Sequence, residues 1–314
     1  MATSGSYDFS VTASEVMTEA AETIGILEAG ESLTSNDSTS MLRTLNMLVK
    51  QWSANFDFAP GFKAFQRKRG YVFLQADTSV YNLGPSGDNA SLAYVSTTMR
   101  IAGISTDTTL QVTSTTGMTA ADKIGIELDS GSIYWTTIAS VTDGDTLVIS
   151  AGLTGGAAIG NRIFTYTTKL IRPLIIENVM RRDVSSNDYL MDPFTIDDYE
   201  RITVKGNDGT PGSWAYENTL VNGKLYIDIE PQTVTDVLRL TFIAPAEDYD
   251  STANDIAYPQ EWFLPLALGL AKLAAPKFGV TWGDLHESNY IEALRNARSS
   301  YAETTELYFE SGCD

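Results

Sequence analysis

The stretch Trp262-Phe-Leu-Pro-Leu-Ala-Leu-Gly-Leu-Ala-Lys-Leu-Ala-Ala275 is the most hydrophobic of the chain. Only Lys272 interrupts it, and it is too short to span a bilayer, so it predicts a buried core helix. Pro259 is placed to open this helix, and Pro276 is placed to end or kink it. Such a helix must be covered by other segments, and the rest of the sequence shows which ones are available.

Apolar residues recur at helical spacing in three other segments, Val11–Leu27, Asn36–Trp52 and Thr281–Phe309. The first of them opens with Thr12 and Glu15 at the spacing of a capping box. Together with the core helix, two helices are expected near the N-terminus and two near the C-terminus. We therefore predict a helical bundle formed from both ends of the chain.

Short strands and turns fill the middle of the chain. Residues 90–168 are rich in Thr, Ser, Gly and Ile and poor in Lys and Arg. Five strands are expected there, at Leu110–Val112, Ile124–Leu128, Tyr134–Ile138, Leu147–Ile149 and Arg162–Tyr166. Regular short strands of this kind are typical of a small β-sandwich or barrel.

Outside that segment, further β-type or apolar runs occur at Tyr71–Leu74, Ile171–Ile176, Trp214–Tyr216, Lys224–Ile229 and Leu238–Ile243. The predicted fold class is therefore α+β, with helices at the ends and a β-rich middle. We expect a host domain of residues 1–89 and 169–314, interrupted by an inserted β-rich module at 90–168. Residues 301–314 form a separate C-terminal tail in this prediction.

Composition narrows the classes of function. The chain has 314 residues with 40 acidic and 21 basic side chains, which gives a net charge of −19. That charge argues against a nucleic-acid groove and suits a wall along which a polyanion slides without binding. The single Cys excludes an intramolecular disulfide and a Cys-based zinc cluster. The N-terminus lacks a basic region and an apolar stretch, so we expect no signal peptide, no membrane span and synthesis in the cytoplasm.

Candidates for chemistry are few. His286, the only His, has Asp284 and Ser288 as neighbours, but a triad needs a nucleophile and an orienting group that are separate in space. Carboxylate pairs such as Asp197-Asp198 suit turn or cap positions, and Asp143-Gly-Asp145 suits a hairpin turn more than a calcium loop. We therefore predict no catalytic, cofactor-binding or metal-binding residues, and no cofactor.

Two basic clusters and an apolar tail are the candidate contact residues. Arg67-Lys68-Arg69 and Arg181-Arg182 could touch DNA or pair with acids on a neighbouring copy, and in so acidic a chain the second is favoured. Leu307, Tyr308 and Phe309 stand in an acidic tail with little of their own chain left to pack on, which leaves partner binding and simple fraying as alternatives.

Several segments together resemble the head-to-tail adaptor family, also called tail accessory factors or head completion proteins, of short-tailed double-stranded DNA bacteriophages. They are the Thr12 helix with Ile24-Gly-Ile-Leu27, Leu45-Asn-Met-Leu-Val-Lys-Gln-Trp52, Tyr81-Asn-Leu-Gly-Pro-Ser-Gly-Asp88, Arg172-Pro173, Gly209-Thr-Pro-Gly-Ser-Trp214, Gly223-Lys-Leu-Tyr-Ile-Asp-Ile-Glu-Pro231, Tyr258-Pro-Gln-Glu-Trp262 and Gly269-Leu-Ala-Lys-Leu-Ala-Ala-Pro276. Their order along most of the chain carries the resemblance. In the family pattern the Gly-Asp turn leads almost directly to the Arg-Pro strand, so the module at 90–168 lies outside the resemblance.

The resemblance implies a structural, non-enzymatic protein of the virion, located at the head–tail junction. It implies a dodecameric ring that binds beneath the portal, extends the channel used in DNA ejection and offers an attachment surface to tail nozzle or fibre proteins. Double-stranded DNA would pass through its lumen without sequence-specific binding. A ring of this kind favours partner binding by the tail, with Tyr301, Leu307, Tyr308 and Phe309 as portal-binding residues.

Three alternatives remain open at this point. The chain could be a virion-associated cell-wall hydrolase, since such an enzyme needs only two carboxylates. It could be another tail ring, such as the nozzle, or a fibre-attachment protein. It could also be a surface-binding or carbohydrate-binding protein centred on residues 92–168.

Overall fold

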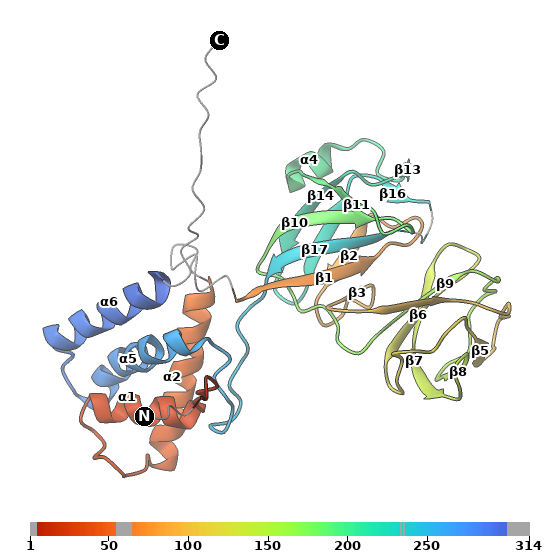
Figure 1. The fold of residues 1–314 in the computed structure, drawn as a ribbon. Helices are drawn as coiled ribbons and strands as arrows, with labels where there is room; N and C mark the ends of the chain where they lie inside the picture. The colour runs from red at the N-terminus through yellow and green to blue at the C-terminus, as the bar shows by residue number, and fades with distance from the viewer. Residues whose placement is uncertain (1–4, 55–64, 233, 235, 300–314) are drawn as a thin grey trace. The chain divides into compact units, whose positions relative to one another are not determined.

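The computed structural model describes residues 5–54, 65–232, 234 and 236–299. It divides into two compact units, one built from residues 1–66 and 245–314 and the other from residues 67–244. The first, here called the helical unit, holds the helices of both chain ends, and the second, here called the β unit, holds the strands (Figure 1). The expected mixture of α and β structure is confirmed.

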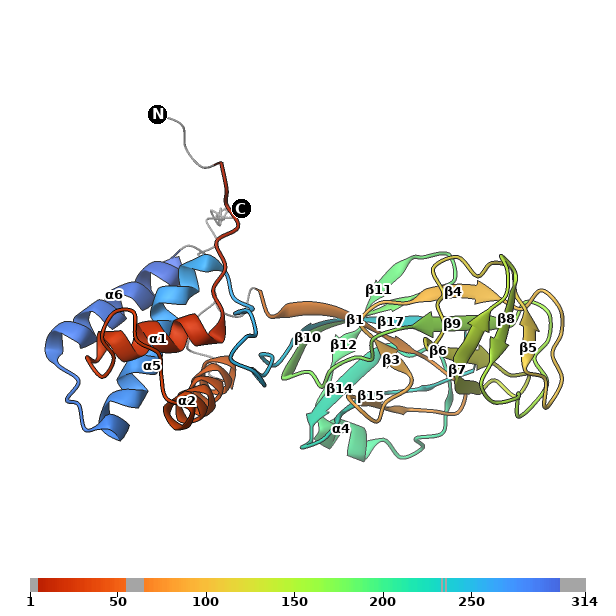
Figure 2. The same ribbon diagram turned by 90° about the horizontal axis from the view of Figure 1, so that it is seen from below.

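The helical unit contains α1 (Ala13–Thr23), α2 (Ser35–Ala54), α5 (Phe263–Ala274) and α6 (Asp284–Ser299), with short 3₁₀ turns at Gln260–Trp262 and Ala275–Phe278. All four helices contribute to one hydrophobic core, and Figure 2 shows the red and orange helices beside the blue ones. Trp52 of α2 packs edge-to-face on Trp262, with 5.9 Å between ring centroids. The most hydrophobic stretch of the sequence is thus covered by helices from both ends.

Local signals set the ends of these helices. Thr12 and Glu15 form the predicted capping box, whereas α2 is capped by Thr34, whose Oγ1 accepts a bond from Asp37 N at 3.2 Å. Helix α1 stops at Thr23, earlier than expected, because Gly25 takes a left-handed conformation. Helix α5 ends just before Pro276, as predicted. No helix within the described ranges combines the length and apolar character needed to cross a membrane.

The β unit contains three main structures. A five-stranded sheet has the order β11-β10-β17-β1-β3, a four-stranded sheet has the order β12-β14-β15-β2, and a six-stranded sheet has the order β4-β9-β6-β7-β8-β5. The strands of the first are β1 (Arg67–Phe73), β3 (Ala90–Ser91), β10 (Ile175–Arg182), β11 (Asp188–Leu190) and β17 (Val237–Ile243). Those of the second are β2 (Val80–Leu83), β12 (Asp192–Pro193), β14 (Ser213–Asn218) and β15 (Gly223–Ile227).

Smaller elements complete these two sheets. Helix α4 (Ile196–Arg201) follows β12, and β13 (Asp208–Gly209) pairs in parallel with β16 (Glu230–Pro231). The five- and four-stranded sheets share a hydrophobic core that includes Val72, Leu225 and Leu240. One face of the five-stranded sheet is therefore buried, and alternate residues on its strands point to the opposite face.

The six-stranded sheet consists of β4 (Val95–Thr98), β5 (Thr109–Gln111), β6 (Lys123–Glu127), β7 (Ile133–Val141), β8 (Thr146–Ile149) and β9 (Arg162–Tyr166). All five strands predicted for this region are confirmed, and β4 is an additional one. The sheet is curled, because a bridge between Met99 and Val112 joins its first strand to its last. A separate hydrophobic core fills its interior.

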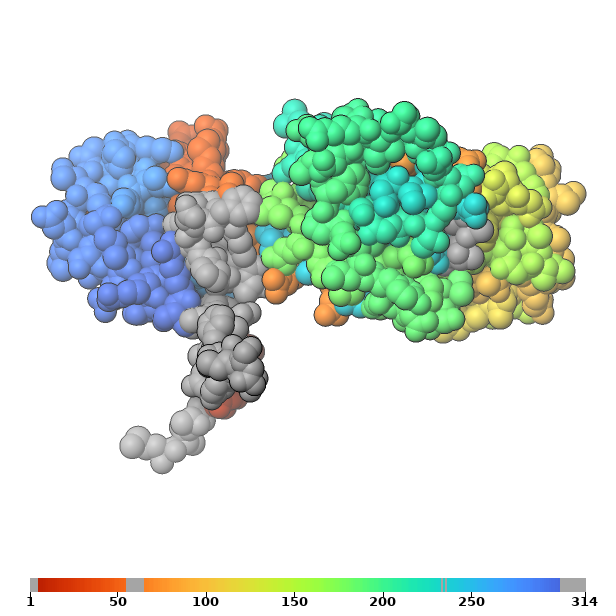
Figure 3. Space-filling model, turned by 90° about the horizontal axis from the view of Figure 1, so that it is seen from above, coloured from red at the N-terminus to blue at the C-terminus, as the bar shows by residue number. Residues whose placement is uncertain are grey.

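An aromatic cluster, which we call the junction cluster, ties the six-stranded sheet to the five-stranded one. Phe73 of β1 stacks on Phe164 of β9 with 4.5 Å between ring centroids, and both are fully buried. Ile133, Tyr166, Val234 and Val237 complete this cluster. In the space-filling view, the yellow-green atoms of the six-stranded sheet adjoin the green and cyan atoms of the chain that follows it (Figure 3). The assignment of 90–168 as an inserted module stays a prediction, and that segment shares this core with β1 and β17.

Candidate functional site

The two predicted basic clusters lie on the same sheet but at opposite ends of it. Arg67, Lys68 and Arg69 begin β1, where Arg67 faces Ile243 at the end of β17. Arg181 and Arg182 end β10, where Arg182 faces Val237 at the start of β17. Because β1 and β10 both run antiparallel to β17, the two clusters are separated by the length of that strand. They do not form one continuous basic surface.

Acidic residues of the same chain pair with these arginines. Arg67 Nε lies 2.6 Å from Glu177 Oε2, and Glu177 sits at the β-bulge of β10. Arg181 Nη1 lies 2.5 Å from Asp236 Oδ2. The basic side chains on this sheet are therefore largely compensated within the chain, which weakens any attraction for phosphate.

Asp188 of β11 pairs with two arginines from neighbouring strands. Arg182 donates from Nε and Nη2 to its two carboxylate oxygens at 2.7 and 2.9 Å, and Arg239 Nη1 lies 2.7 Å from Oδ2. The side chains of all three are between a fifth and a third exposed. Hydrogen bonds from Arg182 outweigh desolvation and hold the pKa of the Asp188 carboxyl group below its ordinary value.

Replacing Asp188 with asparagine is expected to lower the free energy of unfolding of the β unit by about 1–2 kcal/mol at pH 7. Because the folded-state pKa is lowered, this stabilisation is complete above the unfolded value of about 3.9 and is lost as pH falls through the folded one. Urea unfolding at several pH values would therefore show the difference from wild type shrinking below about pH 4. Glu200→Gln, which removes an exposed pair with Lys205, is the matched control. An equal loss in both variants would contradict the assignment.

The predicted portal-binding residues cannot be placed. Tyr301, Leu307, Tyr308 and Phe309 lie outside the described residues, as does the whole tail 301–314. The last described residues belong to α6, which ends at Ser299.

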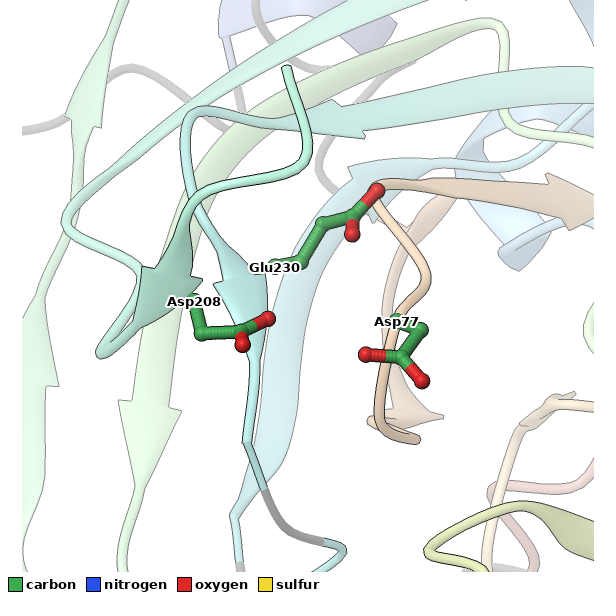
Figure 4. Close-up of side chains that lie close together, drawn as sticks. All are labelled: Asp77, Asp208 and Glu230. Atoms are coloured by element: carbon green, nitrogen blue, oxygen red, sulfur yellow. The ribbon is translucent and has the colours of Figure 1, made fainter. Parts of the chain in front are cut away.

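Three carboxylates form an arrangement that sequence reasoning missed. Asp77, Asp208 and Glu230 bring one oxygen each within 4.8 Å of one another, and among the described residues this is the group that could hold a metal ion (Figure 4). Asp77 follows β1, while Asp208 and Glu230 are register partners in the β13–β16 pair. Two of the three are exposed, and exposed acids gather in this way without an ion. Their wide spacing in sequence explains why no motif marks them.

Two of the carboxylates weighed for catalysis or calcium binding, Asp198 and Asp143, have structural roles. Asp198 caps α4, and Asp143 accepts a bond from Asp145 N in the turn between β7 and β8. His286 lies beside Trp282, with 5.1 Å between ring centroids. Hydrogen bonds, mostly from neighbouring Ser, Thr, Asn and Asp residues, lower the pKa of Asp8, Glu15, Asp143, Asp183 and Asp198. The general acid of a glycosidase needs a raised pKa. None of these five carboxyl groups therefore has the pKa expected of such an acid.

Comparisons with known proteins add little to this geometry. No protein-family model matches the chain, and no curated protein matches it. Among solved structures, the chain is similar to VP17, a capsid protein of bacteriophage P23-77, at 9% sequence identity. The alignment covers 60% of this chain and 77% of that one, with a TM-score of 0.12. At that score the likeness supports no conclusion about fold or function.

Proposed function

We propose that this chain is a structural, non-enzymatic virion protein, a head-to-tail adaptor that forms a dodecameric ring beneath the portal at the head–tail junction. The observation that supports it most is the helical unit, in which α1 and α2 share one core with α5 and α6. In this proposal the four helices act as a helical bundle that presents its outer faces to neighbouring copies. Such faces can repeat the same contact from copy to copy, which is what a closed ring requires.

Exposed apolar side chains on the helical unit offer contact surface for neighbouring copies. Those on its helices are Met47 on α2, Leu264 and Leu273 on α5, and Leu285 and Ile291 on α6. Single exposed apolar residues are common, but five on three helices of one unit suit a surface that is covered on assembly. A head-to-tail interface that closes by rotation would cover them without leaving an open end.

The charge of the chain suits a channel wall. The net charge is −19, and four arginines on the five-stranded sheet are paired with acids of the same chain, namely Arg67, Arg181, Arg182 and Arg239. A wall of this kind repels phosphates, so DNA would pass through the lumen during ejection without being held. The segment 90–168 would serve in this proposal as an outward-facing module that contacts a tail nozzle or fibre protein.

The C-terminal tail provides the direct test of portal binding. Deleting residues 301–314 is expected to weaken binding to the portal of the same virus by about 30-fold or more, since aromatic and apolar anchors dominate such interfaces. Binding would be measured by analytical ultracentrifugation, and rings on portals would be counted by negative-stain microscopy. Circular dichroism should show the deleted protein still folded.

Two sets of substitutions in the full chain test whether portal binding depends on the apolar or on the acidic residues of the tail. Replacing Leu307, Tyr308 and Phe309 together with alanine should reproduce the deletion. Replacing Glu303, Glu306 and Glu310 with glutamine should leave binding within about threefold, because exposed charges contribute little. Full portal binding by the deleted protein would refute the assignment of the tail as the anchor, and rings absent from wild-type mixtures would refute the adaptor proposal.

A further inference from the structure

A polar cavity of about 290 Å³ opens in the β unit where β2 and the turn after it face β7. It is lined by ten residues, among them Gln75, Thr78, Asn82, Asp88, Asn89 and Trp135. Most of its accessible surface is polar. Its volume lies just below the range for pockets that bind drug-sized molecules, so it is sized for one small ring.

The lining side chains are held in place by their own hydrogen bonds. Gln75 Nε2 donates to Thr78 Oγ1 at 2.9 Å, and Gln75 Oε1 accepts from Asn89 Nδ2 at 3.2 Å. Tyr81 donates from its hydroxyl group to the carbonyl oxygen of Thr78 at 3.0 Å. A site whose polar groups are already ordered loses little entropy when a ligand arrives.

The turn that forms one wall requires its glycines. Gly84 has a φ of +146°, and a Cβ added to Gly87 would lie 1.9 Å from the carbonyl oxygen of Asn82. The backbone of the turn is also tied to the β14–β15 hairpin, because Ser86 N donates to Asn222 Oδ1 at 3.1 Å. This close packing holds the backbone of Asn82, whose exposed side chain lines the cavity.

Charge inside the cavity is compensated. Asp88 pairs with Lys123, at 3.3 Å, and with Lys169. Burial raises the pKa of the Asp88 carboxyl group, but the bonds from the two lysines outweigh it and leave the pKa below its ordinary value. The carboxylate is therefore ionised at neutral pH, and its charge is already balanced. The remaining groups are amides and hydroxyls, which suit an uncharged ligand with several hydroxyl groups.

Trp135 adds an aromatic surface to this polar lining. Its ring packs over its cross-strand partner Gly125, where an added Cβ would come within 2.6 Å of the ring. Phe73 and Tyr166 lie 5.6 and 5.5 Å away between ring centroids. The indole is thus fixed, and it is half-buried, so part of it remains for a ligand. Fixed aromatic surface beside polar groups matches a pyranose ring, which has an apolar C–H face and hydroxyls around its edge.

We infer that this cavity binds one neutral pyranose unit, with Asn82 and Asp88 bonding its hydroxyl groups and Trp135 covering one face of the ring. The inference does not depend on the proposed ring, and it adds a carbohydrate-binding site to the chain. The sugar could be free or the end unit of a polysaccharide, since the chemistry recognised is the same. The side chains involved come from both sides of the junction cluster, so the site exists only in the complete β unit.

The full-length chain would be tested by saturation-transfer NMR with the methyl glycosides of glucose, galactose and N-acetylglucosamine at up to about 10 mM. At least one should bind, and the matching oligosaccharide should compete for the same site if the natural ligand is a polysaccharide end. Asn82→Ala should weaken binding about fivefold, since it removes one or two hydrogen bonds, with the melting temperature unchanged. Asn207→Ala, an exposed asparagine elsewhere in the β unit, should bind as wild type does.

Tryptophan fluorescence tests whether the sugar contacts the indole ring of Trp135. The sugar should change the emission of the wild-type protein, and Trp135→Phe should abolish that change even where NMR still detects binding. Three results would overturn the inference: no glycoside binding at the highest concentration, equal affinity of the Asn82→Ala and Asn207→Ala proteins, or binding of methyl glucuronide alone. The last would show that the site takes an anion.

Discussion

Replacing Trp262 with alanine is expected to lower the free energy of unfolding of the helical unit by about 3–5 kcal/mol. The side chain is fully buried, and it touches Trp52 of α2 as well as Phe65. Removing it leaves a large cavity between helices that come from opposite ends of the chain, and backbone relaxation fills such cavities only in part. Urea unfolding followed by circular dichroism at the helix band would measure the loss.

Leu264→Ala is the matched control, because this neighbour on α5 is 56% exposed and should change stability by no more than about 0.5 kcal/mol. A double-mutant cycle with Trp52→Ala then tests whether the two chain ends stabilise each other. Residues in contact couple by about 0.5–3 kcal/mol. Additive effects of the two substitutions would mean that the N-terminal and C-terminal helices do not share a core.

The helices and most strands were predictable because their signals are local. The Thr12 and Glu15 capping box, the proline before α5 and the alternating run in β17 each depend on a few neighbouring residues. Strand β4 escaped prediction because Val95-Ser-Thr-Thr98 is mostly polar and has no fully buried residue. The apolar run Ile171–Ile176 marks only the start of β10, which begins at Ile175 and continues through charged residues to Arg182, where its side chains form ion pairs.

Side-chain partners were predictable only where they lie in one hairpin. Arg182 and Asp188 are register partners across the β10–β11 hairpin, so a hairpin prediction there would have paired them. Arg239 reaches the same carboxylate from a strand far along the chain, and its position depends on the sheet order. The cavity at Asn82 and Trp135 likewise joins the host strands to the six-stranded sheet. Sheet order is a property of the whole chain, which a pass along the sequence does not supply.

Replacing Phe73 with alanine should have a comparable effect on the β unit, about 3–5 kcal/mol. Phe73 is fully buried in the junction cluster, where it stacks on Phe164 and lies 5.2 Å from Tyr94 between ring centroids. Its loss removes contacts on both sides of that cluster, so the five-stranded and six-stranded sheets should both unfold at lower urea. Leu220→Ala, at the 91% exposed tip of the β14–β15 hairpin, is the control and should leave stability within about 0.5 kcal/mol.

The same variant bears on the predicted module at 90–168. Deleting residues 92–168 would uncover Phe73 and Val237 from the junction cluster, so we expect the shortened chain to lose stability unless these residues are made polar. Phe164→Ala, which approaches the cluster from the other side, should couple to Phe73→Ala by about 0.5–3 kcal/mol. If the two substitutions are additive, and an isolated fragment of residues 90–168 unfolds with the full stability it has in the intact chain, the six-stranded sheet is an autonomous insertion. Strong coupling would instead make it part of one cooperative β unit, whose outer strands a tail protein could contact without separating them from the rest.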